Sequence, residues 1–232
     1  MCEIRLLFPV HMRTFFQTDT WQSGLEEIRV RVGQPIEFCY GSYNCYLTGK
    51  EKEQTFCDEK DYRRWEKDLY HATEADLREM LNYISNYSLY AYKEEIKQGY
   101  ITIEGGHRVG VAGQTVLVDG KIAGISPITF LNIRIAHEKC GCARKILPLI
   151  RQRDSIYNTL ILSMPGAGKT TLLRDSIRAL SNGEAYGIRL KVCVVDERSE
   201  IAASFHGVPQ NDMGPRTDVM DGCGKAEGMQ LL

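Results

Sequence analysis

The segment LSMPGAGKTTLLRD, residues 162–175, constrains the fold of this 232-residue chain more than any other. It follows a short apolar run, NTLIL at 158–162, that is typical of a buried parallel strand. After it, leucine and isoleucine recur at helical spacing as far as the Asn182-Gly183 stop. A glycine-rich turn between a strand and a helix directs backbone N–H groups and the positive end of the helix dipole towards phosphate oxygens. The pattern therefore predicts an α/β unit with a phosphate-binding loop, a P-loop.

The residue types of this loop suit a nucleoside triphosphate with Mg²⁺. Small residues at 166–168 let backbone amides turn inward, and Lys169 would reach the β- and γ-phosphates. Thr170 would ligate Mg²⁺, and Thr171 would bond the α-phosphate. We therefore expect ATP and Mg²⁺ as cofactors; the alternative is an ordinary glycine turn that leads into a helix. The expected cofactor-binding residues are Ser163, Pro165, Gly166, Ala167, Gly168, Lys169, Thr170 and Thr171.

Ser163 stands where the phosphate-loop pattern has its first glycine. Serine fits there if its φ angle is negative, whereas a left-handed conformation would cost about 1 kcal/mol or more. The N–H groups that face phosphate belong to later residues. We therefore expect nucleotide binding to survive, at the same or lower affinity.

A second apolar strand, within LKVCVVDERSEI at 190–201, ends in Asp196 and Glu197. Carboxylates at the carboxyl edge of a strand beside a P-loop are placed to act on Mg²⁺ or on an attacking water. This strand comes directly after the P-loop helix. In ATPases with an inserted strand, that location carries an acidic motif other than Walker B, and Walker B follows one strand later.

The first part of the chain has a different pattern. Residues 25–38 alternate strictly as a half-buried hairpin, and 100–135 alternate as a β-meander with turns at Gly105-Gly106 and Asp119-Gly120. Two helices are expected between them, one capped at Thr73 and one at Ser88, whereas 41–70 show no clean periodicity. Blocks of strands and helices followed by strand–loop–helix–strand predict an α+β domain at 1–145 and an α/β domain at 146–232.

Composition limits the function classes. A net charge of −1 gives no basic excess for neutralising phosphates, so no nucleic acid is expected as a partner. No apolar run approaches the roughly 18 residues needed to cross a bilayer, and the N-terminus does not resemble a signal peptide. Eight cysteines without an export signal indicate reduced thiols. The C-x-C pair Cys140 and Cys142 has no second pair at metal-site spacing, so no zinc site is expected.

Four segments carry a specific resemblance. They are LEEIRVRVGQPIE, GYITIEGGHRVGVAGQ, NIRIAHE and VDERSEIA…GVPQNDMGPRTDVMDGCGKAEGM. Together they resemble the stage III sporulation protein AA family of endospore-forming bacteria, from about residue 20 to the end. That family is similar to the hexameric ATPases of type II and type IV secretion systems. The resemblance implies an ATP-binding protein of endospore formation, an ATPase that powers a channel between mother cell and forespore.

The resemblance also implies roles for four residues. Asp196 and Glu197 match the acidic box of the secretion ATPases, where Glu197 would position water or Mg²⁺. Arg134 stands where those ATPases carry a nucleotide-sensing arginine, and Arg216 would act across a subunit boundary. A salt bridge that braces the fold is the alternative role of either arginine. The implied partners are further copies in a hexameric ring and the channel's membrane proteins from the same operon. The implied location is cytoplasmic, including a peripheral position at the inner face of the mother-cell membrane.

The family continues for several strands after KAEGM, among them the Walker B strand. This chain ends at Leu232, so we expect an incomplete P-loop NTPase core of the RecA/AAA+-like type, with turnover near background. Two other function classes remain open. One is a nucleotide-binding or scaffold subunit without hydrolysis. The other is a DNA-directed motor or a kinase, which the missing basic patch disfavours.

Overall fold

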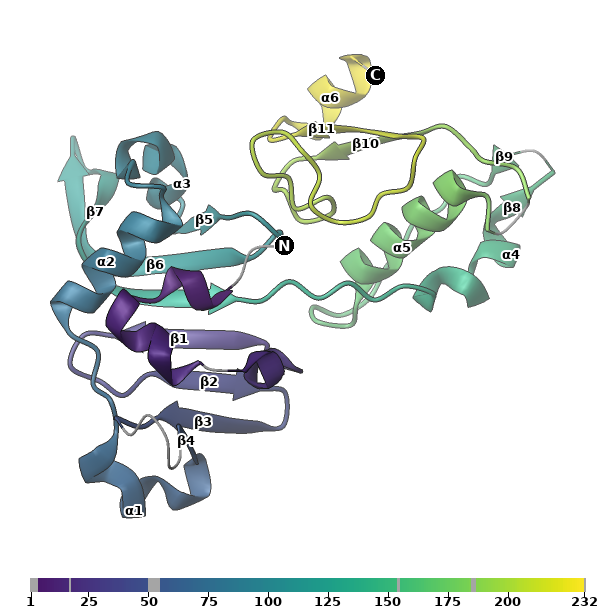
Figure 1. Ribbon diagram of the computed structural model, residues 1–232. Helices are drawn as coiled ribbons and strands as arrows, with labels where there is room; N and C mark the ends of the chain where they lie inside the picture. The colour runs from purple at the N-terminus through teal and green to yellow at the C-terminus, as the bar shows by residue number, and fades with distance from the viewer. Residues whose placement is uncertain (1–3, 17, 50–54, 154, 185–186, 232) are drawn as a thin grey trace. The chain divides into compact units, whose positions relative to one another are not determined.

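The computed structural model describes residues 4–16, 18–49, 55–153, 155–184 and 187–231. It is a mixed α/β protein with a large antiparallel sheet and divides into two compact units, Met1–Ala136 and His137–Leu232 (Figure 1). The domain boundary expected at 145–146 falls inside the second unit. Among the described residues, no helix is both long and apolar enough to cross a membrane.

The first unit is built on a seven-stranded sheet with the order β4-β3-β2-β1-β7-β6-β5, in which every neighbouring pair is antiparallel. The alternating segments at 25–38 and 100–135 supply five of these strands, because period-two side chains place one face of each strand against the core. The strands are β1 (Glu27–Arg31), β2 (Glu37–Tyr40), β3 (Tyr43–Leu47), β4 (Phe56–Asp58), β5 (Tyr100–Thr102), β6 (Arg108–Val118) and β7 (Lys121–Arg134).

Helices pack against this sheet. The longest, α2 (Glu74–Ile84), begins at the expected cap, because Thr73 and Asp76 form a reciprocal capping box. The second expected helix is shorter than the sequence indicated: a 3₁₀ turn, η6 (Leu89–Tyr92), leads into α3 (Lys93–Lys97), and the side chain of Ser88 caps neither. Both α2 and α3 contact β7. Segment 41–70 contains β3 and β4, followed by η4 (Glu59–Asp61), α1 (Tyr62–Trp65) and η5 (Glu66–Asp68).

The N-terminal segment completes the core of the first unit. It forms three 3₁₀ helices, η1 (Ile4–Leu7), η2 (Val10–Phe15) and η3 (Asp19–Gln22). Phe8, Met12 and Phe16 are fully or almost fully buried. The Phe16 ring lies 4.6 Å from Trp21 and 6.0 Å from Phe38 between centroids, so an aromatic cluster joins this segment to the sheet.

The second unit is organised around α5 (Lys169–Asn182). One side of α5 packs with Ala143 and Leu147, and the other packs with Val194 and Met213. The remaining elements are η7 (Cys142–Lys145), α4 (Leu147–Ile150), β8 (Arg151–Gln152), β9 (Ser155–Ile156), β10 (Val192–Asp196), β11 (Thr217–Asp221) and α6 (Lys225–Leu231).

Strand β10 pairs in parallel with β11, a strand that the sequence did not predict. The strand expected at 158–162 is a wrong prediction, because residues 157–164 have no regular secondary structure and join no sheet of the described chain. Leu160 is 79% exposed and Leu162 is 80% exposed. An apolar run alone does not make a strand, because a strand also needs a neighbour that pairs with its backbone.

Candidate functional site

The loop before α5 has the backbone shape that its glycines permit. Gly166 has a φ of 76° and Gly168 a φ of 87°, both in the left-handed region where a side chain is strained. Gly168 is also the N-cap of α5, so the helix begins at Lys169 directly after the turn. The first N–H groups of a helix have no intrahelical partner and carry its positive dipole end. The glycines therefore position a helix N-terminus that suits an anion.

Lys169 folds back over this loop. Its Nζ donates to the carbonyl oxygens of Ser163 and Met164, each at 3.1 Å, and lies 3.4 Å from Ser163 Oγ. The ammonium group is thus held at the loop by neutral acceptors. A phosphate oxygen would be a stronger acceptor for the same group, because hydrogen bonds between ionised partners are about twice as strong.

Ser163 accommodates the missing glycine without backbone strain. It is not among the described residues with positive φ, and its Oγ donates to the carbonyl oxygen of Met164 at 3.0 Å. The geometry therefore meets the condition set by the sequence, that φ stay negative at this position. The effect on nucleotide affinity stays a prediction.

A cavity of about 440 Å³ joins the start of α5 to the carboxyl end of β10. Four of the residues predicted from sequence meet here: Lys169 and Thr170 from the helix, and Asp196 and Glu197 from the strand end. Its volume is within the range of small-ligand sites, roughly 300–1,000 Å³. The lining residues are Ile161, Lys169, Thr170, Leu173, Val195, Asp196, Glu197, Arg198, Glu200, Ile201 and Lys225.

The two acidic residues of the strand end have different environments. Asp196 is 2% exposed, and its carboxylate accepts hydrogen bonds from the backbone N–H groups of Glu200, Ile201 and Ala202 at 2.8–2.9 Å. The Glu197 carboxylate is half-exposed and lies 3.6 Å from Lys225 Nζ, an ion pair that solvent weakens. Asp196 therefore holds the loop that follows, and Glu197 is the acid available to the cavity.

Loop 197–202 has further supports that the sequence did not reveal. Arg174 of α5 donates to the carbonyl oxygens of Ile201 at 2.7 Å and Glu200 at 2.9 Å. Ser199, with a φ of 51°, donates through Oγ to Asp221 Oδ1 at 2.7 Å. Burial raises the pKa of Asp221, and the nearby Asp196 raises it further. The sequence feature that could have pointed to Asp221 is the segment TDVMD at 217–221, which ends in an aspartate as VCVVD at 192–196 does.

The parallel register explains why these aspartates meet. Asp196 and Asp221 are paired positions at the carboxyl ends of β10 and β11. Lys225 follows at the start of α6 and completes the charged rim of the cavity. Parallel strands bring their carboxyl ends to one edge of a sheet, which is where ligands bind in α/β folds.

Of the two predicted arginines, Arg216 does not line this cavity, and Arg134 belongs to the first unit. Arg216 precedes β11, at the other end of the strand from Asp221, and its Nη1 donates to the carbonyl oxygen of Arg189 at 2.8 Å. The backbone N–H of Arg216 also donates to Ser181 Oγ at 2.8 Å. Arg134 is the exposed last residue of β7 in the first unit. In this chain Arg216 braces the segment after α5, and Arg134 ends a strand.

Fold and site together define a mixed α/β protein in which the helix that follows a glycine-rich loop shares a cavity with the acidic end of a strand. Sequence comparison places it more closely. The sequence model of the family described as "Sporulation stage III, protein AA" matches residues 3–232. Stage III sporulation protein AA of Bacillus subtilis (strain 168) is 39% identical over 234 residues, which span 100% of this chain and 69% of that protein. The chain therefore belongs to the stage III sporulation protein AA family.

One solved structure is also similar. The ATPase DotB of Legionella pneumophila, solved by X-ray crystallography, superposes with a TM-score of 0.48 at 17% identity. The match covers 92% of this chain and 51% of that one, so the chain spans about half the length of DotB. A likeness at this level carries no argument about activity.

Proposed function

We propose that this chain is an ATP-binding protein of endospore formation and that its α5–β10 cavity is the nucleotide site of an ATPase that hydrolyses ATP with Mg²⁺. The single observation that carries the proposal is that one cavity collects Lys169 and Thr170 from a helix start together with Glu197 from a strand end. These residues supply three groups that phosphoryl transfer to water uses. They are a cation that binds the phosphates, a hydroxyl that ligates the metal ion and a carboxylate that orients the attacking water.

The residues divide the work as follows in this proposal. The turn at 163–168 and the first amides of α5 hold the phosphates, and Lys169 leaves its carbonyl partners for the β- and γ-phosphate oxygens. Thr170 ligates the Mg²⁺, whose charge would stabilise the phosphate oxygens during transfer. Glu197 orients the attacking water. Asp196 acts through the backbone, because its carboxylate keeps loop 197–202 in place.

The wider setting is proposed on family membership. Members of the family would assemble as a hexameric ring, in which Arg134 and Arg216 act on nucleotide at subunit boundaries. The core would be of the P-loop, RecA/AAA+-like type. The ring would power a channel between mother cell and forespore, with channel membrane proteins as partners and a cytoplasmic or peripheral membrane location. The domain division at 1–145 and 146–232 belongs to the same proposal.

A second candidate is a nucleotide-binding or scaffold subunit that does not turn over. The observation that favours it is Asp196, whose carboxylate is already occupied by three N–H groups, which leaves one acid of the predicted pair for chemistry. The two candidates share the binding site and differ in hydrolysis. Release of labelled phosphate separates them, and stimulation by DNA would instead support the motor class.

The binding site is tested with Lys169→Ala and a matched control, Lys225→Ala, which removes a cation from the opposite rim of the same cavity. We expect Lys169→Ala to weaken fluorescent-ATP binding by at least tenfold, about 1.4 kcal/mol, because the phosphate contact is charge-assisted. Lys225→Ala should weaken it by less than about threefold. If Lys169→Ala leaves affinity within about twofold of the parent, the assignment of the loop is wrong.

A further inference from the structure

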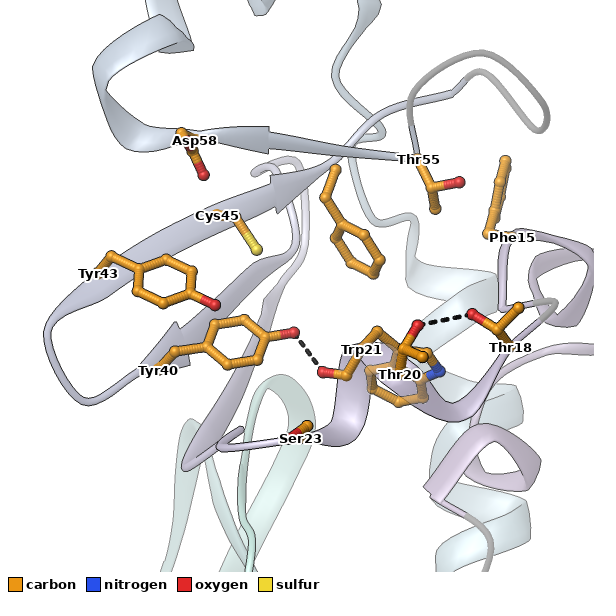
Figure 2. A pocket seen from close by; sticks show the side chains of 11 residues that line it. Phe15, Thr18, Thr20, Trp21, Ser23, Tyr40, Tyr43, Cys45, Thr55 and Asp58 are labelled. Atoms are coloured by element: carbon orange, nitrogen blue, oxygen red, sulfur yellow. Dashed lines mark hydrogen bonds between the residues drawn. The ribbon is translucent and has the colours of Figure 1, made fainter.

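The first unit contains a cavity of about 500 Å³ that the proposed ATP site does not use. It lies between the N-terminal segment at 15–23 and strands β2, β3 and β4 (Figure 2). The lining residues are Phe15, Thr18, Thr20, Trp21, Ser23, Tyr40, Tyr43, Cys45, Thr55, Phe56 and Asp58. Five of these are aromatic, so the walls are large, rigid π surfaces.

The aromatic walls are fixed in place. The rings of Tyr40 and Tyr43 stack at 4.9 Å between centroids with planes 5° apart. The Tyr40 hydroxyl donates to the carbonyl oxygen of Trp21 at 2.5 Å, which ties β2 to the N-terminal segment (Figure 2). Behind them Phe56 packs against Phe38 with ring centroids 5.0 Å apart. A ligand would therefore meet a preformed surface.

The electrostatics of the cavity favour a cation. Among its described lining residues there is no lysine, arginine or histidine, and Asp58 is the acid. Burial raises the pKa of the Cys45 thiol to about 12, so this group is neutral at pH 7. Aromatic faces and a carboxylate both attract ammonium and guanidinium groups.

A second cavity of about 500 Å³ adjoins the first and shares Tyr43 and Asp58 with it. It is lined by the β2–β3 turn and by Asp58, Glu59 and Lys60. Two cavities that share part of their lining suit an elongated ligand better than a small ion.

We propose that the cavity between Trp21, Tyr43 and Asp58 binds a lysine or arginine side chain of an extended peptide segment from a partner protein. The cation lies against Tyr43 and beside Asp58, and the next residues of the peptide occupy the adjoining cavity. This interaction is separate from ATP binding, since all of its residues belong to the first unit.

The full chain with Trp65→Phe makes Trp21 its sole tryptophan, because the sequence has two. Emission is followed while acetylated, amidated Gly-Gly-Arg-Gly-Gly and its lysine analogue are added. The matched probe replaces arginine with citrulline, which has the same shape and no charge. We expect saturable binding of the cationic peptides and at least tenfold weaker binding of the citrulline peptide. Asp58→Asn should weaken the arginine peptide about tenfold, whereas Glu66→Gln, an exposed acid outside both cavities, should not.

Three outcomes would overturn the proposal. They are no saturable binding of either cationic peptide, equal affinity for the citrulline peptide, and unchanged affinity after Asp58→Asn. Methylguanidinium tests the peptide component: if it binds as tightly as the peptide, the site takes a small ion and the peptide assignment is wrong. Near-ultraviolet circular dichroism checks that each variant is folded.

Discussion

The two units of this chain bury their apolar residues to different extents. In the first, seven strands form one sheet, and Phe8, Phe16 and Phe38 are 0–1% exposed. In the second, two separate two-stranded sheets accompany α5, and Leu160, Leu162 and Met164 are 78–80% exposed. Three large apolar side chains exposed so close together along the chain are unusual for a segment that belongs to a packed core. The strands of the first unit pair in one sheet, whereas the apolar run at 158–162 in the second unit pairs with no strand of the described chain.

The largest expected effect is a difference in protease resistance. Backbone that pairs with no strand opens easily, so limited chymotrypsin digestion should first cut the second unit, near Leu160 and Leu162. The first unit should survive as a fragment that begins near the N-terminus and ends after Ala136. Mass spectrometry of a digestion time course identifies the fragments. If both units are cleaved at equal rates, the expected difference in protease resistance between them is wrong.

Truncation of one apolar side chain in each unit should change the free energy of unfolding by very different amounts. Phe38→Ala removes a fully buried ring that contacts four other aromatic rings, so unfolding of the first unit should become easier by about 3–5 kcal/mol. Leu160→Ala removes a side chain that is 79% exposed, so its effect should stay within about 0.5 kcal/mol. Urea unfolding followed by tryptophan emission reports on the first unit, because Trp21 and Trp65 both lie there, and helical circular dichroism, to which α5 contributes, follows the second unit. A large loss from Leu160→Ala would mean that this leucine is buried in solution.

A third prediction separates the two acids of the strand end. Asp196→Ala leaves three backbone N–H groups without their acceptor, so loop 197–202 should lose about 1–3 kcal/mol of stability. Glu197→Ala should change stability by less than about 0.5 kcal/mol, because its ion pair with Lys225 is exposed to solvent. Amide hydrogen exchange of the loop measures both, with the first-unit sheet as internal reference. Similar exchange in the two variants would contradict a holding role for Asp196.

The sequence predicted the periodic part of the fold and little of the rest. Alternation at 25–38 and 100–135 indicated five of the seven sheet strands, and Thr73 with Asp76 indicated the start of α2. The N-terminal 3₁₀ helices were missed, because Phe8, Met12 and Phe16 follow neither a strand nor a helix period. The short strands β3 and β4 lie in a polar segment and form because of their neighbours.

The site shows the same division between local and long-range information. Glycine spacing predicted the loop and the start of α5, and the carboxyl end of β10 predicted an acidic pair beside it. The separate tasks of Asp196 and Glu197 depend on where residues 200–202 return, which one sequence does not reveal. Asp221 and Lys225 enter the site through a parallel pairing of strands about 25 residues apart, and local pattern carries no signal for such a pairing.

The smallest expected effect concerns Ser163, which lies in the glycine-rich loop of the second unit. Ser163 has no positive φ, so the glycine-specific conformation is not needed at this position and Ser163→Gly relieves no backbone strain. The substitution removes one hydroxyl, which lies 3.4 Å from Lys169 Nζ and donates to the Met164 carbonyl oxygen at 3.0 Å. Affinity for fluorescent ATP should therefore change by less than about tenfold, or about 1.4 kcal/mol, in either direction. A larger gain would show that the serine impairs the loop, and it would favour the scaffold candidate over the ATPase. Unfolding of the first unit, monitored in the same samples, should not change, because Ser163 and the first-unit sheet belong to separate compact units.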